Sequence, residues 1–315
     1  LSGGFCELHA GLINTICGLT NKEDAILFST GFTANQGFIG SIASPGDLIL
    51  FDRDCHASLI DGINISGANS LSFKHNNASD LELKLEKNIG KYENVFVIIE
   101  SVYSMSGDEA PLKAISALKK HLPFFLYVDE AHSFGFYGEN AMGYCAREGC
   151  QDQVDFLMST FSKTTASFGG FVATTREFAS YVRTKSRPYL FQATIPPASV
   201  ATILEAINII NTEPQHVKKL WENTVFMRTE LIKAGFDLGS GKSPILTLFV
   251  SDNDVLAQLS NDLYHHNIFT NWVSYPMVPI NKGRLRLIVT SMHSEEDIIN
   301  TIEILSNLGR KHKLI

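Results

Sequence analysis

The stretch VFVIIESVYSMSGDEAPLKAISALKKHLPFFLYVDEAH (residues 95–132) holds two apolar runs separated by an amphipathic segment. The first run, 95–101, is rich in β-branched residues, which favour a buried strand. Residues 112–121 repeat apolar side chains at helical spacing, and residues 124–128 are strand-like again. A strand, a helix and another strand in this order indicate parallel strands joined by a helical crossover.

The same alternation continues on both sides of this stretch. Further strands are predicted over 24–30, 47–52, 70–76, 155–162 and 169–175. Further helices are predicted between them over 33–43, 57–66 and 78–89. This pattern is typical of an α/β fold in which helices cover both faces of a mainly parallel sheet, here of the seven-stranded type.

The regular alternation of strands and helices ends towards the end of the chain. Long helices are predicted near 197–212 and 214–234. Strand and helix patterns then follow in PILTLFVS (244–251), NDVLAQLSNDLYHHN (253–267), RLRLIVT (284–290) and SEEDIINTIEILSNLG (294–309). We therefore predict a large domain over 1–205 and a small α+β domain over 206–315. Because the chain starts with Leu1 and not with Met, we also expect that a segment before it is missing.

Composition excludes several classes of function. The chain has 315 residues and a net charge of −7, without a dense basic stretch, which argues against a nucleic-acid partner. No apolar run reaches the roughly 18 residues of a membrane span. The five cysteines are scattered and form no CxxC pair, so we predict no metal site and a reducing, cytoplasmic location.

Polar residues follow several predicted strands at their carboxyl ends, where the active sites of such folds gather. Gly31 opens a helix after strand 24–30, so backbone amides there can face an anion, although many such turns carry glycine for structural reasons. Asp129 directly follows a buried strand, where it either caps the next segment or pairs with a buried cation. His132 follows the same strand as Asp129, and His56 and Ser104 follow two other strands.

Lys163 lies in STFSKTTASFGGFVATT (159–175), with no other charged residue between Asp155 and Arg176. It is either a surface lysine of a polar loop or a buried, reactive amine. Together with Asp129, the imidazoles, the hydroxyl and the Gly31 turn, it suits pyridoxal phosphate. The lysine forms an imine with the aldehyde, the acid pairs with the ring nitrogen, an imidazole stacks on the ring, and the helix N-terminus takes the phosphate.

The sequence also resembles the α-oxoamine synthases, a pyridoxal-phosphate family with the aspartate-aminotransferase fold, over essentially the whole chain. The matching motifs are STGFTANQG, CHASLIDG, FKHNNASDL, ESVYSMSGDEAPL, VDEAHSFGFYGENAMG, TFSK, RPYLFQATIPP and GRLRLIVTSMHS. The resemblance implies that Lys163 holds the cofactor, Asp129 binds its ring nitrogen, His132 its phenolic oxygen, and His56 stacks on its ring.

Further residues are implied by position. Gly31 and Phe32 would offer backbone amides to the phosphate, and Ser104 and Thr160 would contact the cofactor. Arg286 would bind the substrate carboxylate, unless it forms a surface ion pair on an edge strand. Thr194 would reach the phosphate of the neighbouring subunit. The implied assembly is a homodimer with shared sites. We interpret His9, His75 and Cys55 as structural, and Gln192 departs from the small hydroxylated residue usual in the family.

The implied reaction is a decarboxylative condensation of a small amino acid with an acyl thioester, carried by CoA or by an acyl-carrier protein, to give an α-aminoketone. The motifs favour L-alanine with a pimeloyl thioester, which gives 8-amino-7-oxononanoate in the biotin pathway. Serine with a palmitoyl thioester and glycine with an acetyl thioester stay open, although Ser274 stands where some serine-using relatives carry an additional arginine. A non-catalytic, cofactor-binding subunit is the alternative from another class.

Overall fold

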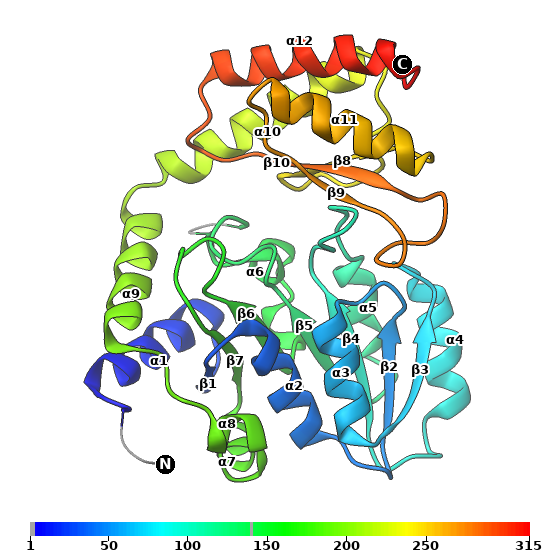
Figure 1. The fold of residues 1–315 in the computed structure, drawn as a ribbon. Helices are drawn as coiled ribbons and strands as arrows, with labels where there is room; N and C mark the ends of the chain where they lie inside the picture. The colour runs from blue at the N-terminus through cyan, green and yellow to red at the C-terminus, as the bar shows by residue number, and fades with distance from the viewer. Residues whose placement is uncertain (1–3, 139–140) are drawn as a thin grey trace. The chain divides into compact units, whose positions relative to one another are not determined.

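The computed structural model describes residues 4–138 and 141–315, so Glu139 and Asn140 of the VDEAHSFGFYGENAMG motif lie outside the described residues. The chain packs into two units (Figure 1). The first comprises Leu1–Val102 and Ala110–Glu213, and the second comprises Tyr103–Glu109 and Pro214–Ile315. That 1–205 and 206–315 fold as separate domains stays a prediction.

The first unit is built on a seven-stranded sheet with the order β1-β7-β6-β5-β4-β2-β3. Its strands are β1 (Asp24–Phe28), β2 (Leu48–Asp52), β3 (Asn69–Phe73), β4 (Val95–Glu100), β5 (Phe125–Asp129), β6 (Phe156–Thr160) and β7 (Gly170–Thr174). The neighbours from β3 to β6 are parallel, and β7 runs antiparallel to both β6 and β1. The predicted α/β fold with a mainly parallel sheet is confirmed.

The predicted helices of the first unit are present with small shifts at their ends. They are α2 (Gly31–Ile42), α3 (Ala57–Ser66), α4 (Ala78–Asn88), α5 (Leu112–Leu118) and α9 (Pro197–Thr212). Elements that were not predicted also occur among the described residues: α1 (Glu7–Thr20), α6 (Tyr144–Glu148), η2 (Gln151–Gln153), α7 (Arg176–Lys185) and α8 (Arg187–Phe191). The start of α1 gives no usual signal because Cys6, not Ser, Thr, Asp or Asn, is its N-cap.

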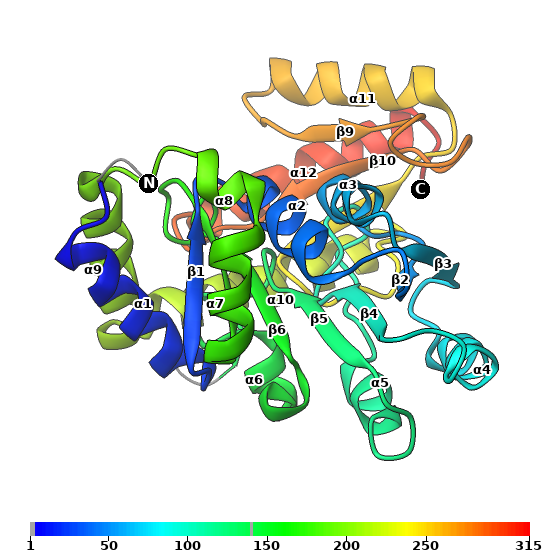
Figure 2. The same ribbon diagram turned by 90° about the horizontal axis from the view of Figure 1, so that it is seen from below.

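Apolar side chains between the sheet and its helices form the core that orders the strand ends. One large cluster joins strand residues such as Phe156 to Phe38 of α2, Leu59 of α3 and Val182 of α7. Figure 2 shows α2 and α3 on one side of the strands, and α4, α5 and α6 on the other. Because both faces are covered, the central strands are buried and polar side chains reach solvent mainly beyond the strand ends.

The second unit contains a three-stranded antiparallel sheet with the order β8-β10-β9. Its elements are β8 (Ile245–Phe249), β9 (Asn271–Val273), β10 (Arg284–Ile288), α10 (Gln215–Lys233), α11 (Asn253–His265) and α12 (Glu295–Lys311). A leucine-rich cluster joins both secondary-structure types, for example Leu285, Leu259 and Leu305. This confirms an α+β arrangement, in which only the three-residue strand β9 was not predicted. Within the described residues, every helix is too short or too polar to cross a bilayer.

Candidate active site

Two buried carboxylates lie side by side at the ends of the central strands. Asp129 is the last residue of β5 and Glu100 the last residue of β4, and the parallel register pairs them directly. Each is only 4% exposed. Burial, and next the negative charge of Asp129, raise the pKa of Glu100 well above its usual range. Glu100 was missed in the sequence, although it ends an apolar strand just as Asp129 does.

The carboxylate of Asp129 is held by a hydrogen bond on each oxygen. Oδ1 accepts the backbone N–H of Ala131 at 2.8 Å, and Oδ2 accepts the Nδ2 amide of Asn35 at 2.8 Å. Tyr127 in turn donates its hydroxyl to Oδ1 of Asn35 at 2.6 Å. These side chains are buried, so their contacts fix the direction in which the carboxylate can meet a cation.

His56 is the N-cap of α3 and contacts the same network. Its backbone N–H donates to Oε1 of Glu100 at 2.6 Å, and its Nδ1 lies 2.8 Å from Oγ of Ser58. Desolvation by surrounding protein lowers the pKa of His56, although the residue is exposed at the chain surface; the charge of Asp129 opposes the shift and that of Lys163 adds to it. A neutral imidazole of this kind can lie against an aromatic ring. The edge-on ring of Phe32, 6.1 Å away between centroids, flanks it.

The first turn of α2 forms a cradle that has no room for a side chain at Gly31. A Cβ atom there would lie 2.8 Å from Cβ and Oγ1 of Thr160, at the end of β6. The backbone N–H groups of Gly31 and Phe32 belong to the first helical turn, which offers them no intrahelical acceptor. Thr160 donates its own hydroxyl to the carbonyl of Gly169 at 3.0 Å. This arrangement fits the phosphate of pyridoxal phosphate.

Lys163 lies in the loop that follows β6, and its side chain is exposed. Of the two alternatives that the sequence left open, the described chain has the exposed lysine, in a turn where the N–H of Ala166 donates to the carbonyl of Lys163 at 3.0 Å. The role of Lys163 as the cofactor-binding amine stays a prediction. The charge of Lys163 nevertheless lowers the pKa values of both His56 and Glu100, so the amine lies within electrostatic reach of the strand-end cluster.

Two other predicted residues of the first unit lie outside its helices and strands. His132 is half-buried in the turn after β5, and Thr194 is half-buried between α8 and α9. Gly4 packs against Thr194, since a Cβ atom at Gly4 would lie 2.9 Å from its Cγ2. Nearby, Gln192 donates to the carbonyl of Leu27 at 3.1 Å and accepts the N–H of Ser29 at 2.7 Å. Gln192 thus joins its segment to β1, which gives this departure from the family pattern a structural role.

Ser104 and Arg286 belong to the second unit. Ser104 is buried in the Tyr103–Glu109 segment. Arg286 lies on β10, the central strand of the small sheet, so the edge-strand alternative is excluded. Burial, and next the charge of Arg284, lower the pKa of Arg286, and its buried Nε has no hydrogen-bond partner among the described residues. A buried cationic donor without an acceptor is suited to an anionic ligand.

The residues interpreted as structural have structural contacts. His9 is fully buried and its Nε2 lies 2.7 Å from the carbonyl of Ile195. His75 and Asp52 pair at 2.8 Å between Nδ1 and Oδ1. With Asp54 they are close enough to surround a metal ion, but Asp52 already accepts hydrogen bonds from two backbone N–H groups of the surrounding turns. Burial raises the pKa of the Cys55 thiol well above its usual range, so its nucleophilic thiolate is disfavoured.

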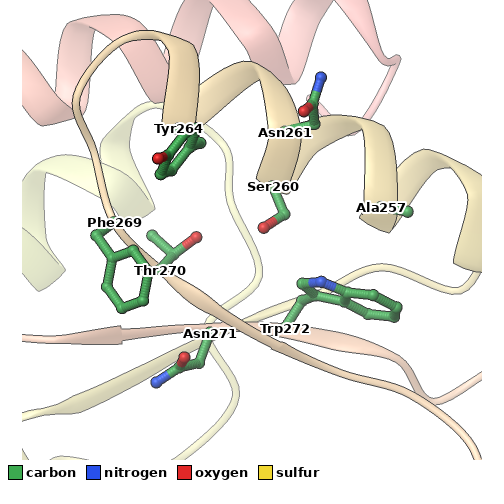
Figure 3. A pocket seen from close by; sticks show the side chains of 8 residues that line it. All are labelled: Ala257, Ser260, Asn261, Tyr264, Phe269, Thr270, Asn271 and Trp272. Atoms are coloured by element: carbon green, nitrogen blue, oxygen red, sulfur yellow. The ribbon is translucent and has the colours of Figure 1, made fainter.

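The second unit also carries an open pocket of about 490 Å³ between α11 and the segment around β9 (Figure 3). Its lining is aromatic and neutral polar: Ala257, Ser260, Asn261, Tyr264, Phe269, Thr270, Asn271 and Trp272. None of the predicted site residues lines it. The chemistry of the candidate site therefore rests on the strand-end cluster and the α2 turn, not on this pocket.

Comparison with known proteins agrees with the geometry. The model of the aminotransferase class I and II family matches residues 4–305. The 8-amino-7-oxononanoate synthase 1 of Bacillus subtilis is 34% identical over 312 residues, which cover 99% of this chain and 79% of that protein. The serine palmitoyltransferase of Sphingobacterium spiritivorum is 35% identical over 300 residues, covering 95% of this chain and 75% of that protein.

A solved structure is similar over the whole chain. It is described as a serine palmitoyltransferase with the PLP internal aldimine; it has a TM-score of 0.95 and 32% identity, and the match covers 100% of this chain and 79% of that one. Family model, relatives and fold thus agree over nearly all of the sequence. The chain belongs to the aminotransferase class I and II family.

Proposed function

We propose that this protein is a pyridoxal-phosphate-dependent acyltransferase that condenses a small amino acid with an acyl thioester, with loss of carbon dioxide. The observation that carries the proposal is the α2 turn, in which Gly31 packs directly on Thr160 within the unit that also holds Asp129, His56 and Lys163. The relatives named 8-amino-7-oxononanoate synthase and serine palmitoyltransferase support the same reaction class.

The residues that would hold the cofactor have distinct tasks. Asp129 would bind the ring nitrogen with a carboxylate already oriented by Asn35 and the N–H of Ala131. The amides of Gly31 and Phe32 would bind the phosphate. The remaining contacts would come from His56 on the ring face and from His132, Ser104 and Thr160. When bound, the cofactor withdraws electrons from the α carbon of the amino acid.

Two side chains would act on the substrate. Lys163 would anchor the cofactor through its amine, and the same amine would serve as the base that removes the α proton. Arg286 would bind the substrate carboxylate, because its buried Nε lacks an acceptor among the described residues. Asp129 would contribute a negative charge beside the ring nitrogen, which would favour a proton there.

For the substrates, L-alanine and a pimeloyl thioester are the pair we favour, with 8-amino-7-oxononanoate as the product used in biotin synthesis. The Bacillus subtilis relative supports this pair, and the Sphingobacterium spiritivorum relative supports serine with a palmitoyl thioester. The test is a thiol-release assay of alanine, serine and glycine against short, medium and long acyl-CoA, repeated with the acyl-carrier-protein thioesters. Catalytic efficiency with alanine should exceed that with serine by at least about tenfold; a preference for serine with a long chain would overturn this choice.

We also propose a cytoplasmic homodimer, in which Thr194 reaches the phosphate site of the partner. Five cysteines without a disulfide in the described structure support a reducing location. Mixing inactive Lys163→Ala and Thr194→Asp chains should restore part of the activity through hybrid sites. A fully active monomer in sedimentation would contradict the shared site.

A purified protein that stays colourless after addition of pyridoxal phosphate, and releases no thiol, would refute the catalytic proposal. It would leave the non-catalytic subunit as the remaining interpretation. Binding with a visible absorption band, but without turnover of any tested pair, would keep the cofactor assignment and reject the substrates.

A further inference from the structure

We infer that Asn35 is a positioning residue that couples the cofactor-binding Asp129 to the ring-stacking His56; this inference rests on the proposed function. Asn35 is 1% exposed and lies on α2, one turn beyond the phosphate cradle. Its Nδ2 donates to Oδ2 of Asp129 at 2.8 Å and to Oγ of Ser58 at 2.9 Å. One buried amide therefore contacts the acid directly and the imidazole through a single hydroxyl.

The hydrogen bonds of this network can be ordered from one end to the other. A carboxylate only accepts, so the NH₂ end of the Asn35 amide must face Asp129, and its carbonyl end must face Tyr127. Tyr127 then donates its hydroxyl to Oδ1 of Asn35 at 2.6 Å. The second amide hydrogen of Asn35 goes to Ser58, whose oxygen has thereby become an acceptor and whose own proton is left to donate onward.

The proton of Ser58 has one partner at the end of the network. Nδ1 of His56 lies 2.8 Å from the Ser58 hydroxyl oxygen and also accepts the backbone N–H of Ser58 at 3.2 Å. Because a backbone N–H only donates, Nδ1 must be the unprotonated nitrogen, and the ring proton of neutral His56 is on Nε2. Asn35 thus helps to set the tautomer of His56 while it orients Asp129.

Loss of the amide should act on the cofactor and not only on the fold. Without Asn35, Oδ2 of Asp129 loses a charge-assisted donor in a buried setting, and Ser58 is free to turn its proton away from His56. Asp129 would then bind the ring nitrogen less firmly, and the imidazole of His56 would be held less firmly against the ring face. A merely structural asparagine would lower stability and leave the bound cofactor unaltered.

The experiment compares Asn35→Ala with wild type and with Asn223→Ala. Asn223 is a matched control, because it is also buried and donates its Nδ2 to two acceptors, the carbonyls of Thr290 and His293, within the second unit. Apo protein is titrated with pyridoxal phosphate to measure Kd, and the visible absorption of the bound cofactor is followed against pH. Thermal unfolding of the apo proteins is measured in parallel.

The expected result for Asn35→Ala is a Kd raised about tenfold or more and a displaced pH midpoint of the absorption band. Asn223→Ala should lower thermal stability while keeping both cofactor readouts. Ser58→Ala and Tyr127→Phe break the network at its two other links, and each should shift the pH midpoint in the same direction by a smaller amount. If Asn35→Ala does not fold, Ser58→Ala and Tyr127→Phe still test the positioning role.

A wild-type-like Kd and pH midpoint in Asn35→Ala, or in both of the other variants, would overturn the positioning role. That outcome requires that the wild type binds the cofactor, so it leaves the proposed function standing. Failure of the wild type to bind pyridoxal phosphate would instead refute the proposed function, and the inference with it.

Discussion

Asp129 is a buried carboxylate and Arg286 a half-buried guanidinium with a buried Nε, and their hydrogen bonding differs. Each oxygen of Asp129 accepts a hydrogen bond, from Ala131 and from Asn35. Arg286 has a buried Nε without an acceptor among the residues that the structure describes. This difference fits the proposed function, in which Asp129 would stay oriented throughout the reaction and Arg286 would keep a donor for the substrate carboxylate.

Glu130 shows a third solution to the same problem. It is fully buried, its Oε1 accepts the N–H of Cys145 at 2.6 Å, and its Oε2 has no partner among the described residues. Burial raises the pKa of Glu130 to about 7. Protonation therefore reduces the cost of burying Glu130. In Asp129 hydrogen-bond donors reduce that cost, and for Arg286 we expect a ligand to do so.

The largest effect is expected from Lys163→Ala, which leaves all three of these groups in place. Turnover should fall by more than about a thousandfold, because the anchor and the base are lost together. Steady-state thiol release measures this loss, and borohydride reduction of the wild type should fix the cofactor to the peptide containing Lys163. Exposed Lys218, with the same substitution, serves as the control and should keep full activity. Labelling of another lysine would refute the assignment.

Asp129→Asn tests the partnered charge. It keeps the shape of the side chain but removes the negative charge beside the ring nitrogen, so the rate of α-proton exchange should fall by about a hundredfold or more. Exchange of the α proton with solvent, followed by NMR, isolates this step. Asp254→Asn, on the exposed first turn of α11, should have no effect. Near-normal exchange in Asp129→Asn would show that the donors of Asp129 serve the fold and not the chemistry.

Arg286→Ala tests the charge that lacks an acceptor. The KM for the amino acid should rise by about tenfold or more, and the KM for the thioester should change little, because only the carboxylate contact is lost. Arg284 is the neighbouring control: it donates to the carbonyl of Met105 at 2.9 Å and lies over the ring of Phe249, so Arg284→Ala should cost stability instead. An equal rise of both KM values would contradict carboxylate binding by Arg286.

The last expected effect concerns folding stability instead of activity, and it comes from Glu130 and its pH dependence. Its folded-state pKa of about 7 exceeds the ordinary value of 4.5, so the folded state binds the proton more tightly. The resulting stabilisation is fully present below pH 4.5 and is lost as pH rises through 7, with a size on the order of 3 kcal/mol. The free energy of unfolding is measured in urea between pH 4 and 8 for wild type and for Glu130→Gln. This decline should appear in the wild type and be absent from the variant. Parallel curves would mean that Glu130 does not titrate in this range.

Much of the fold followed from local patterns. Seven strands and the main helices were predicted within a few residues, because buried parallel strands are apolar runs and the crossover helices repeat every 3.6 residues. Prediction was poorer where the signal was weak: α1 begins at a cysteine cap, and Thr175, the N-cap of α7, was assigned to the preceding strand. The three residues of β9 are too few to show a period.

By itself the sequence determined the α/β fold, the strand-end positions of Asp129 and His56, and the resemblance that assigns a role to Lys163. Only the tertiary structure decided that Asn35 contacts Asp129, 94 positions away in the chain. It also decided that Glu100 lies beside Asp129 on the adjacent strand, and that β10 is the central strand of the small sheet. The exposure of Lys163 was also visible only there. The reason is physical: periodicity and capping act over a few residues, whereas strand order and helix packing bring distant side chains together, and burial and pKa depend on those neighbours.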